Sequence, residues 1–296
     1  MKAGSYRLPR PKFVDRLDEE ENRKRFEICQ IEFRSSSLRA GICADPPAAA
    51  VIQATGVAHT KQALLARRAA LNTKDMKLNL ELFRRPLLQL ALDFTDLDQA
   101  FKIAAATYPH FDLLEIGTPL IIEEGLGALQ KLKAQFPDKL FLADLKIMDA
   151  GHLEARSGFL RGADVVTVLG VADDSTIRGA IDAARECDGY LMADLIGLPD
   201  PAKRARRLQE LGVDCVCVHT AYDRSSRGVS PLSELEQVRA AITGSVAVAG
   251  GLRLENTEQV IAAGGNIMVV GGAITTHANP GAVAKSIFQK IQDHLR

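Results

Sequence analysis

Eight short apolar runs recur at regular intervals along the C-terminal two-thirds of the chain, and no other feature limits its possible folds as strongly. Their sequences and first residues are LQLALD from Leu88, DLLEIG from Asp112, KLFLAD from Lys139, ADVVTVLG from Ala163, GYLMADLIG from Gly189, DCVCVHT from Asp214, SVAVAGG from Ser245 and NIMVVGG from Asn266. Apolar and often β-branched runs of this length predict strands that are buried on both faces of a sheet.

Helical patterns separate these runs. The clearest are TDLDQAFKIAAATY, DSTIRGAIDAAREC, DPAKRARRLQELG, PLSELEQVRAAI and NTEQVIAAGG. Strands that alternate with helices predict a parallel sheet, and eight such units in residues 87–296 predict an α/β fold of the (β/α)8 TIM-barrel type, which would form the catalytic domain. An open doubly wound sheet is the alternative. We favour the barrel because the first strand ends at Asp93 and no G-x-G-x-x-G turn follows it.

Residues 1–86 have a different character. Two stretches, RLDEEENRKRFEICQIEF and HTKQALLARRAAL, have weak helical patterns, and the loop-like RSSS and ADPPAAA lie between them. The segment contains too few large apolar residues for a core of its own, so we expect an N-terminal extension that is partly helical or disordered. Met76 begins MKLNLELF and would serve as a start for the compact domain.

Composition excludes several classes of protein. The formal net charge is zero and there is no Trp; no basic stripe with interleaved aromatic residues is present, so we expect no nucleic-acid partner. No apolar run is long enough to cross a bilayer, and the N-terminus lacks the order of a secretory signal. The five cysteines are sparse and odd in number, as is typical of reduced cytoplasmic proteins. We interpret Cys215 and Cys217 as core packing rather than as metal ligands.

Polar residues stand where the predicted strands end. They are Asp93, Glu115, Asp144 with Lys146, Thr167, Asp194 and His219. Because the C-terminal ends of barrel strands meet at one mouth, we expect these side chains to form one site. Two structural alternatives remain: Asp93 could cap the helix that follows it, and Glu115 could form an ion pair with Lys146 at the barrel rim.

Two glycine pairs end the last two predicted strands. Gly250 and Gly251 close AVAGG, and Gly271 and Gly272 close MVVGG. Loops after the seventh and eighth strands of barrels often bind phosphate through backbone N–H groups, so we expect a phosphate site here, with Arg253 as the nearest source of positive charge. The alternative is that the glycines only permit tight turns.

The stretch ADLKIMDAG matches the D-x-K-x-x-D-A-G signature of the orotidine 5′-phosphate decarboxylase suprafamily. The chain from Leu88 onward resembles one branch of it, the 3-hexulose-6-phosphate synthases, in EIGTPLI, DVVTVLGVADDSTIRGAI, MADLIG, VCVHTAYD, VAVAGG and VVGGAIT. A sibling branch, the 3-keto-L-gulonate-6-phosphate decarboxylases, shares DAG. That branch typically has arginine at the positions of Tyr222 and Gly272 here, which favours the synthases.

The resemblance implies an aldol reaction between formaldehyde and D-ribulose 5-phosphate that gives D-arabino-hex-3-ulose 6-phosphate through a 1,2-enediolate. It implies Mg2+, with Mn2+ as a substitute, held by Glu115 and Asp144. Lys146 would stabilise the enediolate oxygen and His219 would transfer a proton. The sugar phosphate would be bound by Asp93, Thr167, Asp194, Gly250, Gly251, Gly271 and Gly272.

The resemblance also implies a homodimer in which Asp149 reaches the neighbouring subunit's site. The runner-up activity is decarboxylation of 3-keto-L-gulonate 6-phosphate through the same enediolate. A non-catalytic sugar-phosphate sensor or scaffold is the alternative from another class. Residues 1–86 could dock a partner such as the isomerase that consumes the product.

Overall fold

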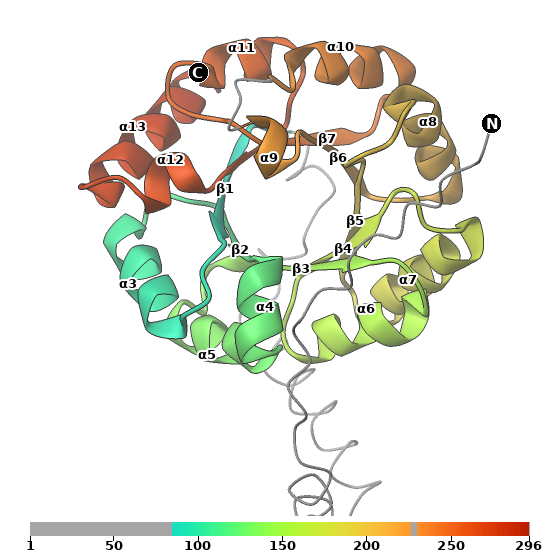
Figure 1. The fold of residues 1–296 in the computed structure, drawn as a ribbon, viewed down its shortest axis with the longest axis horizontal. Coiled ribbons are helices and arrows are strands. Elements are labelled where there is room, and N and C mark those ends of the chain that lie inside the picture. Colours follow the sequence, from blue (N-terminus) through green and yellow to red (C-terminus); the bar gives the residue numbers. More distant parts are fainter. Residues whose placement is uncertain (1–84, 226–229, 296) are drawn as a thin grey trace, which may run out of the picture. The chain divides into compact units, whose positions relative to one another are not determined.

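A computed structural model describes residues 85–225 and 230–295, so the predicted extension lies outside the described residues apart from residues 85–86. Eight parallel strands in chain order close into a barrel, with the last strand paired to the first (Figure 1). They are β1 (Leu87–Leu92), β2 (Leu113–Ile116), β3 (Leu140–Ile147), β4 (Val165–Leu169), β5 (Tyr190–Asp194), β6 (Cys215–His219), β7 (Ser245–Ala249) and β8 (Ile267–Val270). The predicted (β/α)8 barrel is therefore confirmed, and each strand coincides with one of the eight apolar runs.

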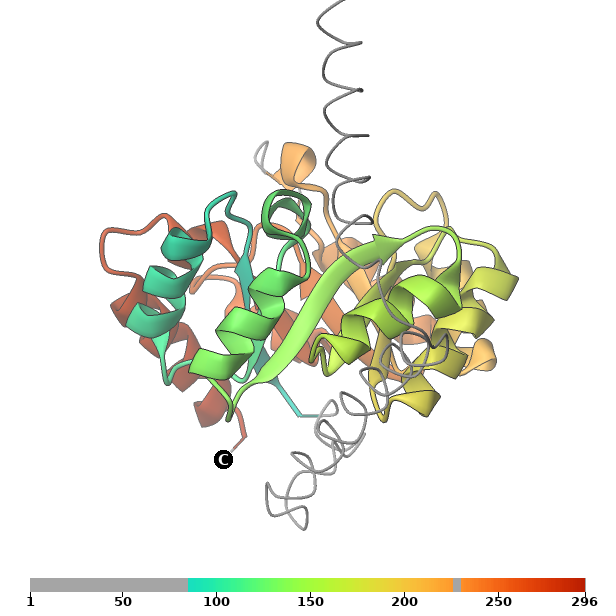
Figure 2. The same cartoon turned by 90° about the horizontal axis from the view of Figure 1, so that it is seen from below.

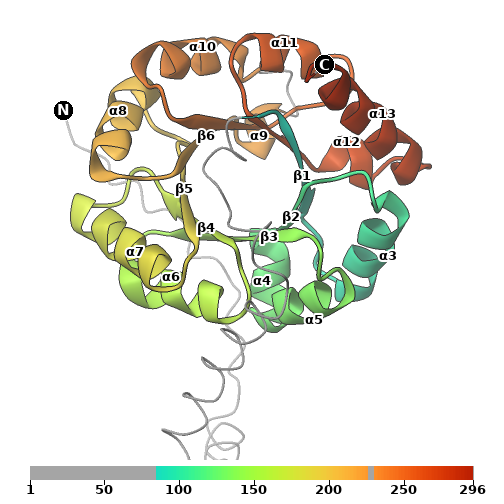
Figure 3. The same cartoon turned by 180° about the vertical axis from the view of Figure 1, so that it is seen from behind.

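Helices surround the barrel, as the views along its axis from either end show (Figures 1 and 3). They are α3 (Leu97–Thr107), α4 (Thr118–Glu124), α5 (Gly127–Gln135), α6 (Gly151–Leu160), α7 (Asp174–Glu186), α8 (Pro201–Leu211), α9 (Tyr222–Ser225), α10 (Leu232–Ala241), α11 (Thr257–Ala262), α12 (Gly272–Thr275) and α13 (Pro280–Asp293). None of these helices is long and apolar enough to cross a membrane.

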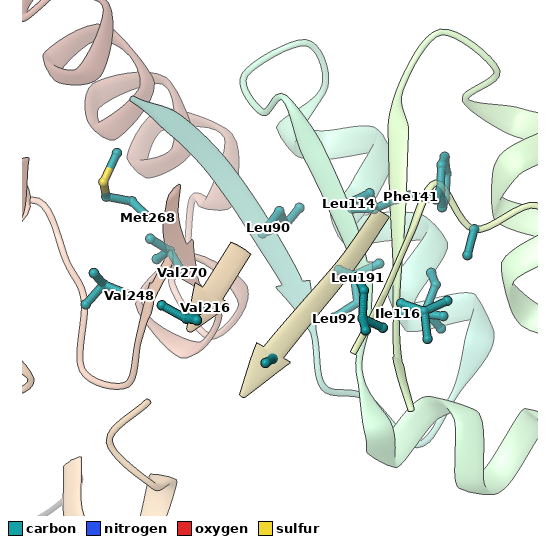
Figure 4. Packing of buried hydrophobic residues seen from close by; sticks show 14 of the residues in the cluster. Leu90, Leu92, Leu114, Ile116, Phe141, Leu191, Val216, Val248, Met268 and Val270 are labelled. Atoms are coloured by element: carbon teal, nitrogen blue, oxygen red, sulfur yellow. The ribbon is translucent and has the colours of Figure 1, made fainter. Parts of the chain in front are cut away.

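The core has two parts because successive strand residues face opposite sides of the sheet. Outward residues such as Leu90, Leu114 and Val248 pack beneath the helices (Figure 4). Inward residues such as Leu113, Leu142 and Ala247 fill the barrel. Inward side chains are apolar in the lower part of the barrel and polar towards the C-terminal ends of the strands. The barrel interior is therefore packed with apolar side chains beneath a mouth that is lined by polar ones.

The capping residues of the helices that follow the strands are not the polar residues predicted to form the site. Asp96, not Asp93, caps α3, because its side chain accepts a hydrogen bond from the backbone N–H of Gln99 at 2.8 Å. Likewise Asp173 and Asp200 cap α7 and α8. The capping alternative for Asp93 is therefore wrong, and its carboxylate lies in the mouth instead.

The DAG stretch joins β3 to α6 in a conformation that requires small residues. Ala150 has a φ of 48°, in the left-handed region, immediately before α6 begins. A Cβ at Gly151 would collide with the backbone carbonyl of Thr176 in α7. The side view shows α6 beside β3 (Figure 2). Small residues here thus let α6 pack closely against α7 and fix where the β3–α6 loop leaves the barrel.

We predict that Gly151→Ala destabilises the fold by about 1–3 kcal/mol, because the added methyl group overlaps a backbone carbonyl that cannot move without shifting α7. Gly127→Ala is the matched control, since a Cβ at Gly127 in α5 meets nothing within 4 Å and alanine favours a helix. Urea unfolding measures both variants. Equal stability of Gly151→Ala and Gly127→Ala would contradict the predicted overlap.

Candidate active site

The C-terminal ends of the strands surround a cavity of about 530 Å3. Every strand contributes to it directly or through the loop that follows it. The predicted residues that line it are Asp93, Glu115, Asp144, Lys146, Thr167, Asp194, His219, Gly250, Gly251, Gly271 and Gly272. The structure therefore brings together all the predicted site residues except Asp149.

Asp144 is buried at the centre of a hydrogen-bond network. Its Oδ1 accepts a hydrogen bond from the hydroxyl of Thr167 at 2.7 Å, and its Oδ2 accepts one from the hydroxyl of Thr118 at 2.9 Å. Oδ2 also forms an ion pair with the ammonium of Lys146. Three partners from three segments thus fix the carboxylate, as a buried charge requires.

Lys146 is held as an ammonium group. Burial alone would lower its pKa, but the nearby carboxylates of Asp144, Asp194 and Glu115 outweigh burial and raise the pKa above its ordinary value. Its Nζ lies 3.9 Å from Asp194 Oδ2 as well as against Asp144. The ion-pair alternative with Glu115 is therefore replaced by a pairing with two other carboxylates, and Lys146 suits charge stabilisation better than attack as a free amine.

The backbone of Lys146 is unusual. Its φ is 45°, a left-handed value rare for residues other than glycine. The β3–β4 register shifts between Ala143 and Ile147, and the hydroxyl of Thr167 accepts a hydrogen bond from the Lys146 N–H at 3.0 Å. Such irregularities redirect side chains at the rims of barrels. Here the irregularity lies at Lys146, whose side chain lines the mouth together with that of Asp144.

Glu115 and Asp93 lie near Asp144 and carry like charge. Burial, and then the charges of Asp144 and Asp93, raise the pKa of Glu115 well above its ordinary value, against a hydrogen bond from Gln89. Burial and Asp144 likewise raise the pKa of Asp93, although Lys146 and His219 oppose this. Crowded carboxylates with raised pKa values are typical of functional sites.

His219 is oriented by a carboxylate. Its Nδ1 lies 2.8 Å from Asp194 Oδ2, while Asp194 Oδ1 accepts a hydrogen bond from the N–H of Ile196 at 2.9 Å. With Nδ1 donating to Asp194, Nε2 is the ring nitrogen that can exchange a proton with a ligand. The arrangement resembles the base-and-orienting-group pairs of many acid–base sites.

The two glycine turns differ. Gly250 and Gly251 have φ values of 93° and 73°, and a Cβ at Gly250 would collide with the carbonyl of Thr220. Gly271 caps the short helix α12 with a negative φ of −107°, and a Cβ at Gly272 would meet nothing within 4 Å. Only the first turn therefore requires glycine for its backbone conformation. Both turns line the cavity.

Asp149 does not line the cavity of its own chain. It is exposed in the β3–α6 loop, and its Oδ1 accepts a hydrogen bond from the N–H of Ala150 at 2.7 Å. The family resemblance predicts that this carboxylate serves a neighbouring subunit. Its exposure at the same end of the barrel leaves it accessible to one.

Sequence reasoning did not single out several residues of the site. Gln89, Met192, Cys217 and Thr276 also line the cavity, and Thr118 holds Asp144. Gln89 could have been found as the polar residue at an inward position of LQLALD. Cys215 and Cys217 are buried inside the barrel, and burial raises the pKa of the Cys215 thiol to about 12, in keeping with the expected packing role.

The raised pKa values give a sign for the pH dependence of stability. The folded, metal-free protein binds protons on Glu115 and Asp93 more tightly than the unfolded chain. The stability that this tighter proton binding contributes is fully present below the unfolded pKa of about 4. It is lost as pH rises through the raised pKa values of the folded state. The loss is about 1.4 kcal/mol for every tenfold difference in proton affinity between the two states. We predict that Glu115→Gln flattens this decrease in melting temperature.

Thermal unfolding in EDTA across the acid to neutral range measures the effect. Glu154→Gln, which changes an exposed carboxylate on α6, is the control and should keep the slope of the wild type. Parallel profiles of melting temperature against pH for wild type and Glu115→Gln would show that Glu115 is not the carboxyl group responsible for the decrease.

Comparisons with known proteins agree with this geometry. Residues 86–287 match the family model described as Orotidine 5'-phosphate decarboxylase / HUMPS family. A curated relative from Staphylococcus saprophyticus, 3-hexulose-6-phosphate synthase 3, is 43% identical over 206 residues, which span 69% of this chain and 98% of the relative. The 3-hexulose-6-phosphate synthase of Bacillus subtilis is 39% identical over 205 residues, again 69% of this chain and 98% of the relative.

Solved structures give the same result. The 3-hexulose-6-phosphate synthase from Salmonella typhimurium superposes with a TM-score of 0.69 at 38% identity, covering 70% of this chain and 99% of that one. A structure of KGPDC from Streptococcus mutans superposes with a TM-score of 0.66 at 26% identity, covering 70% of this chain and 98% of that one. The synthase is thus the more similar of the two.

Proposed function

We propose that this chain, which belongs to the orotidine 5′-phosphate decarboxylase / HUMPS family, is a 3-hexulose-6-phosphate synthase, a lyase of the aldolase type. It joins formaldehyde to D-ribulose 5-phosphate, reversibly, and gives D-arabino-hex-3-ulose 6-phosphate. The observation that carries the proposal is the Asp144–Lys146 pair in a mouth that also holds Glu115, Asp194 and His219. Its relatives at about 40% identity bear the same name.

The reaction begins when a proton leaves C1 of the ketose, which puts negative charge on two neighbouring oxygens. Lys146 remains an ammonium and stabilises that charge where it develops. His219, oriented by Asp194, moves the proton at C1 or at the oxygen of formaldehyde. Asp93, Thr167 and Asp194 position the sugar, and the glycine turns at residues 250–251 and 271–272 bind the phosphate through backbone N–H groups.

The residues present fit a divalent cation. Among the described residues no three His, Cys, Asp or Glu side chains form a ready-made metal cluster. Mg2+, however, is usually held by one or two carboxylates with waters and substrate oxygens. Glu115 and Asp144 are two such carboxylates, and a cation would offset the burial and the neighbouring negative charge that raise the pKa of Glu115. When bound, Mg2+ or Mn2+ supplies positive charge beside the developing enediolate.

The enzyme is a homodimer in this proposal, and Asp149 completes the site of the partner. Four large apolar side chains are exposed on the elements that adjoin β3 and β4, namely Ile122 on α4, Met148 in the β3–α6 loop, Leu153 on α6 and Val171 after β4, with exposed fractions of 74%, 53%, 69% and 55%. The helices α4 and α6 flank β3 (Figure 1). Exposed apolar surface of this kind is typical of protein interfaces.

Residues 87–296 form the catalytic domain in this proposal, and residues 1–86 are an extension to it. The sparse cysteines favour the cytoplasm, where the reaction would be the formaldehyde-fixing step of the ribulose monophosphate pathway in one-carbon metabolism. Decarboxylation of 3-keto-L-gulonate 6-phosphate is the second candidate. An uncharged side chain, Tyr222, stands in the cavity wall at a position where that branch typically has arginine, and arginine is the usual partner of a substrate carboxylate.

We predict that the wild type consumes formaldehyde only when both D-ribulose 5-phosphate and Mg2+ are present, and that EDTA abolishes the reaction. Lys146→Ala should lower kcat by about 10²–10³ or more, because it removes a charge aimed at the developing oxyanion. Lys131→Ala, an exposed lysine on α5, is the control. Formaldehyde consumption measured with a colorimetric reagent reports all of these reactions.

Other outcomes would decide between the alternatives. Release of CO2 from 3-keto-L-gulonate 6-phosphate, with formaldehyde untouched, would establish the decarboxylase. Inactivity of a folded protein in both assays would favour the non-catalytic sugar-phosphate sensor or scaffold.

We predict that two inactive variants, Lys146→Ala and Asp149→Asn, regain part of the wild-type activity when they are mixed, unfolded and refolded together. A hybrid dimer contains one site with an intact Lys146 and an Asp149 from the other chain. Each variant refolded alone is the control. No recovery, with hybrid dimers shown to form by native mass spectrometry, would mean that Asp149 does not act across the interface.

A further inference from the structure

Gln89 is a buried polar residue whose role the proposed reaction does not explain. It lies on β1 at an inward position, between Leu87 and Ala91, and its exposed fraction is 2%. It also lines the cavity at the mouth. Its neighbours on the adjacent strands, Leu113 of β2 and Val269 of β8, are apolar.

The two ends of the Gln89 amide have different surroundings. Nε2 donates a hydrogen bond of 2.6 Å to Glu115 Oε2, one strand away. Oε1 is buried and has no hydrogen-bond partner among the described residues. Buried carbonyl oxygens in folded proteins nearly always have a partner, since an unpaired one loses its hydrogen bonds to water without compensation.

Rotating the amide does not solve the problem. With its two ends exchanged, the Gln89 carbonyl would face the ionised Glu115 carboxylate that a bound cation requires, and two acceptors would oppose each other. The neighbouring inward side chains, Leu113 and Val269, offer no N–H or O–H group. A donor for Oε1 must therefore come from whatever fills the cavity.

We propose that Gln89 is a positioning residue with two contacts: its N–H group holds the Glu115 carboxylate in place, and its carbonyl oxygen accepts a hydrogen bond from an O–H group of the bound ligand. That O–H group belongs either to a water carried with the divalent cation or to a hydroxyl of the sugar phosphate. The inference rests on the proposed function, because it assigns Glu115 to the cation. The inference adds Gln89 to the residues that contact the bound cation or sugar phosphate.

The consequence for the cation follows from the first contact. A carboxylate that is fixed by a second hydrogen bond binds a metal more tightly, and loss of such an outer partner typically costs about 10–100-fold in affinity. Within the described part of the chain, Gln89 is the side chain that donates a hydrogen bond to Glu115. Its loss should therefore weaken cation binding even when no substrate is present.

The test compares Gln89→Met with Leu87→Met. Methionine keeps the length of glutamine but makes neither hydrogen bond. Leu87 is a buried inward residue of the same strand and is not among the residues that line the cavity, so Leu87→Met is a matched change of the barrel interior. Binding of Mn2+ alone is measured by the electron paramagnetic resonance signal of the free ion, and binding of D-ribulose 5-phosphate in EDTA by calorimetry.

We expect Gln89→Met to bind Mn2+ about 10–100-fold more weakly than the wild type, while Leu87→Met stays within about twofold. If the sugar phosphate in EDTA also binds more weakly to Gln89→Met, the hydroxyl of the sugar is the donor to Oε1. If its affinity is unchanged, the donor is a water carried with the cation. Neither readout needs turnover, so a wild type that binds Mn2+ but consumes no formaldehyde would refute the proposed reaction and not this inference.

A folded Gln89→Met protein that binds both ligands as the wild type does would overturn the proposal, as would a wild type that binds no Mn2+. Gln89→Leu repeats the test in case the first variant fails to fold, with the melting temperature as the check. If neither variant folds, Gln89 fills the barrel as a structural residue and the proposal fails.

Discussion

The mouth of this barrel depends on one ammonium group among several carboxylates. Parallel strands that close into a barrel bring Asp93, Glu115, Asp144 and Asp194 to one edge, whatever their separation in the sequence. Like charges in a buried space are costly, and Lys146 compensates for two of them through its pairing with Asp144 and its approach to Asp194. Glu115 accepts its hydrogen bond from the neutral amide of Gln89 instead, and burial and neighbouring negative charge raise its pKa. This charge distribution supports the proposed cation site.

The local backbone makes that charge distribution possible. Residues two apart in a regular strand face the same side, so Asp144 and Lys146 share the inward face of β3. The register shift between Ala143 and Ile147, with Lys146 in the left-handed region, adjusts the strand at the mouth. Strained conformations persist only where the surroundings hold them. Here Thr167 does so from β4 by accepting the Lys146 N–H and donating to Asp144.

Most of the barrel could be predicted from the sequence because its buried strands are continuous apolar runs. These runs predicted β1 to β8, and the polar residues at their ends predicted that Glu115, Asp144 and His219 belong to the site. The sequence did not predict which partners these side chains choose, since pairing depends on the register between strands. An ion pair of Lys146 with Glu115 was one alternative, yet Lys146 Nζ pairs with Asp144 and Asp194. The helix α4, which begins at Thr118, was missed because its short apolar sequence TPLII has no helical period.

Two unfavourable features of the mouth have one remedy in common. Glu115 is a carboxyl group with a raised pKa, and the carbonyl of Gln89 has no partner among the described residues. Both residues lie on the wall of one cavity. A cation would compensate the negative charge of the first, and its waters or a hydroxyl of the sugar phosphate would donate a hydrogen bond to the second. Natural proteins concentrate such violations where they function, while the apolar floor and the helical shell stabilise the fold.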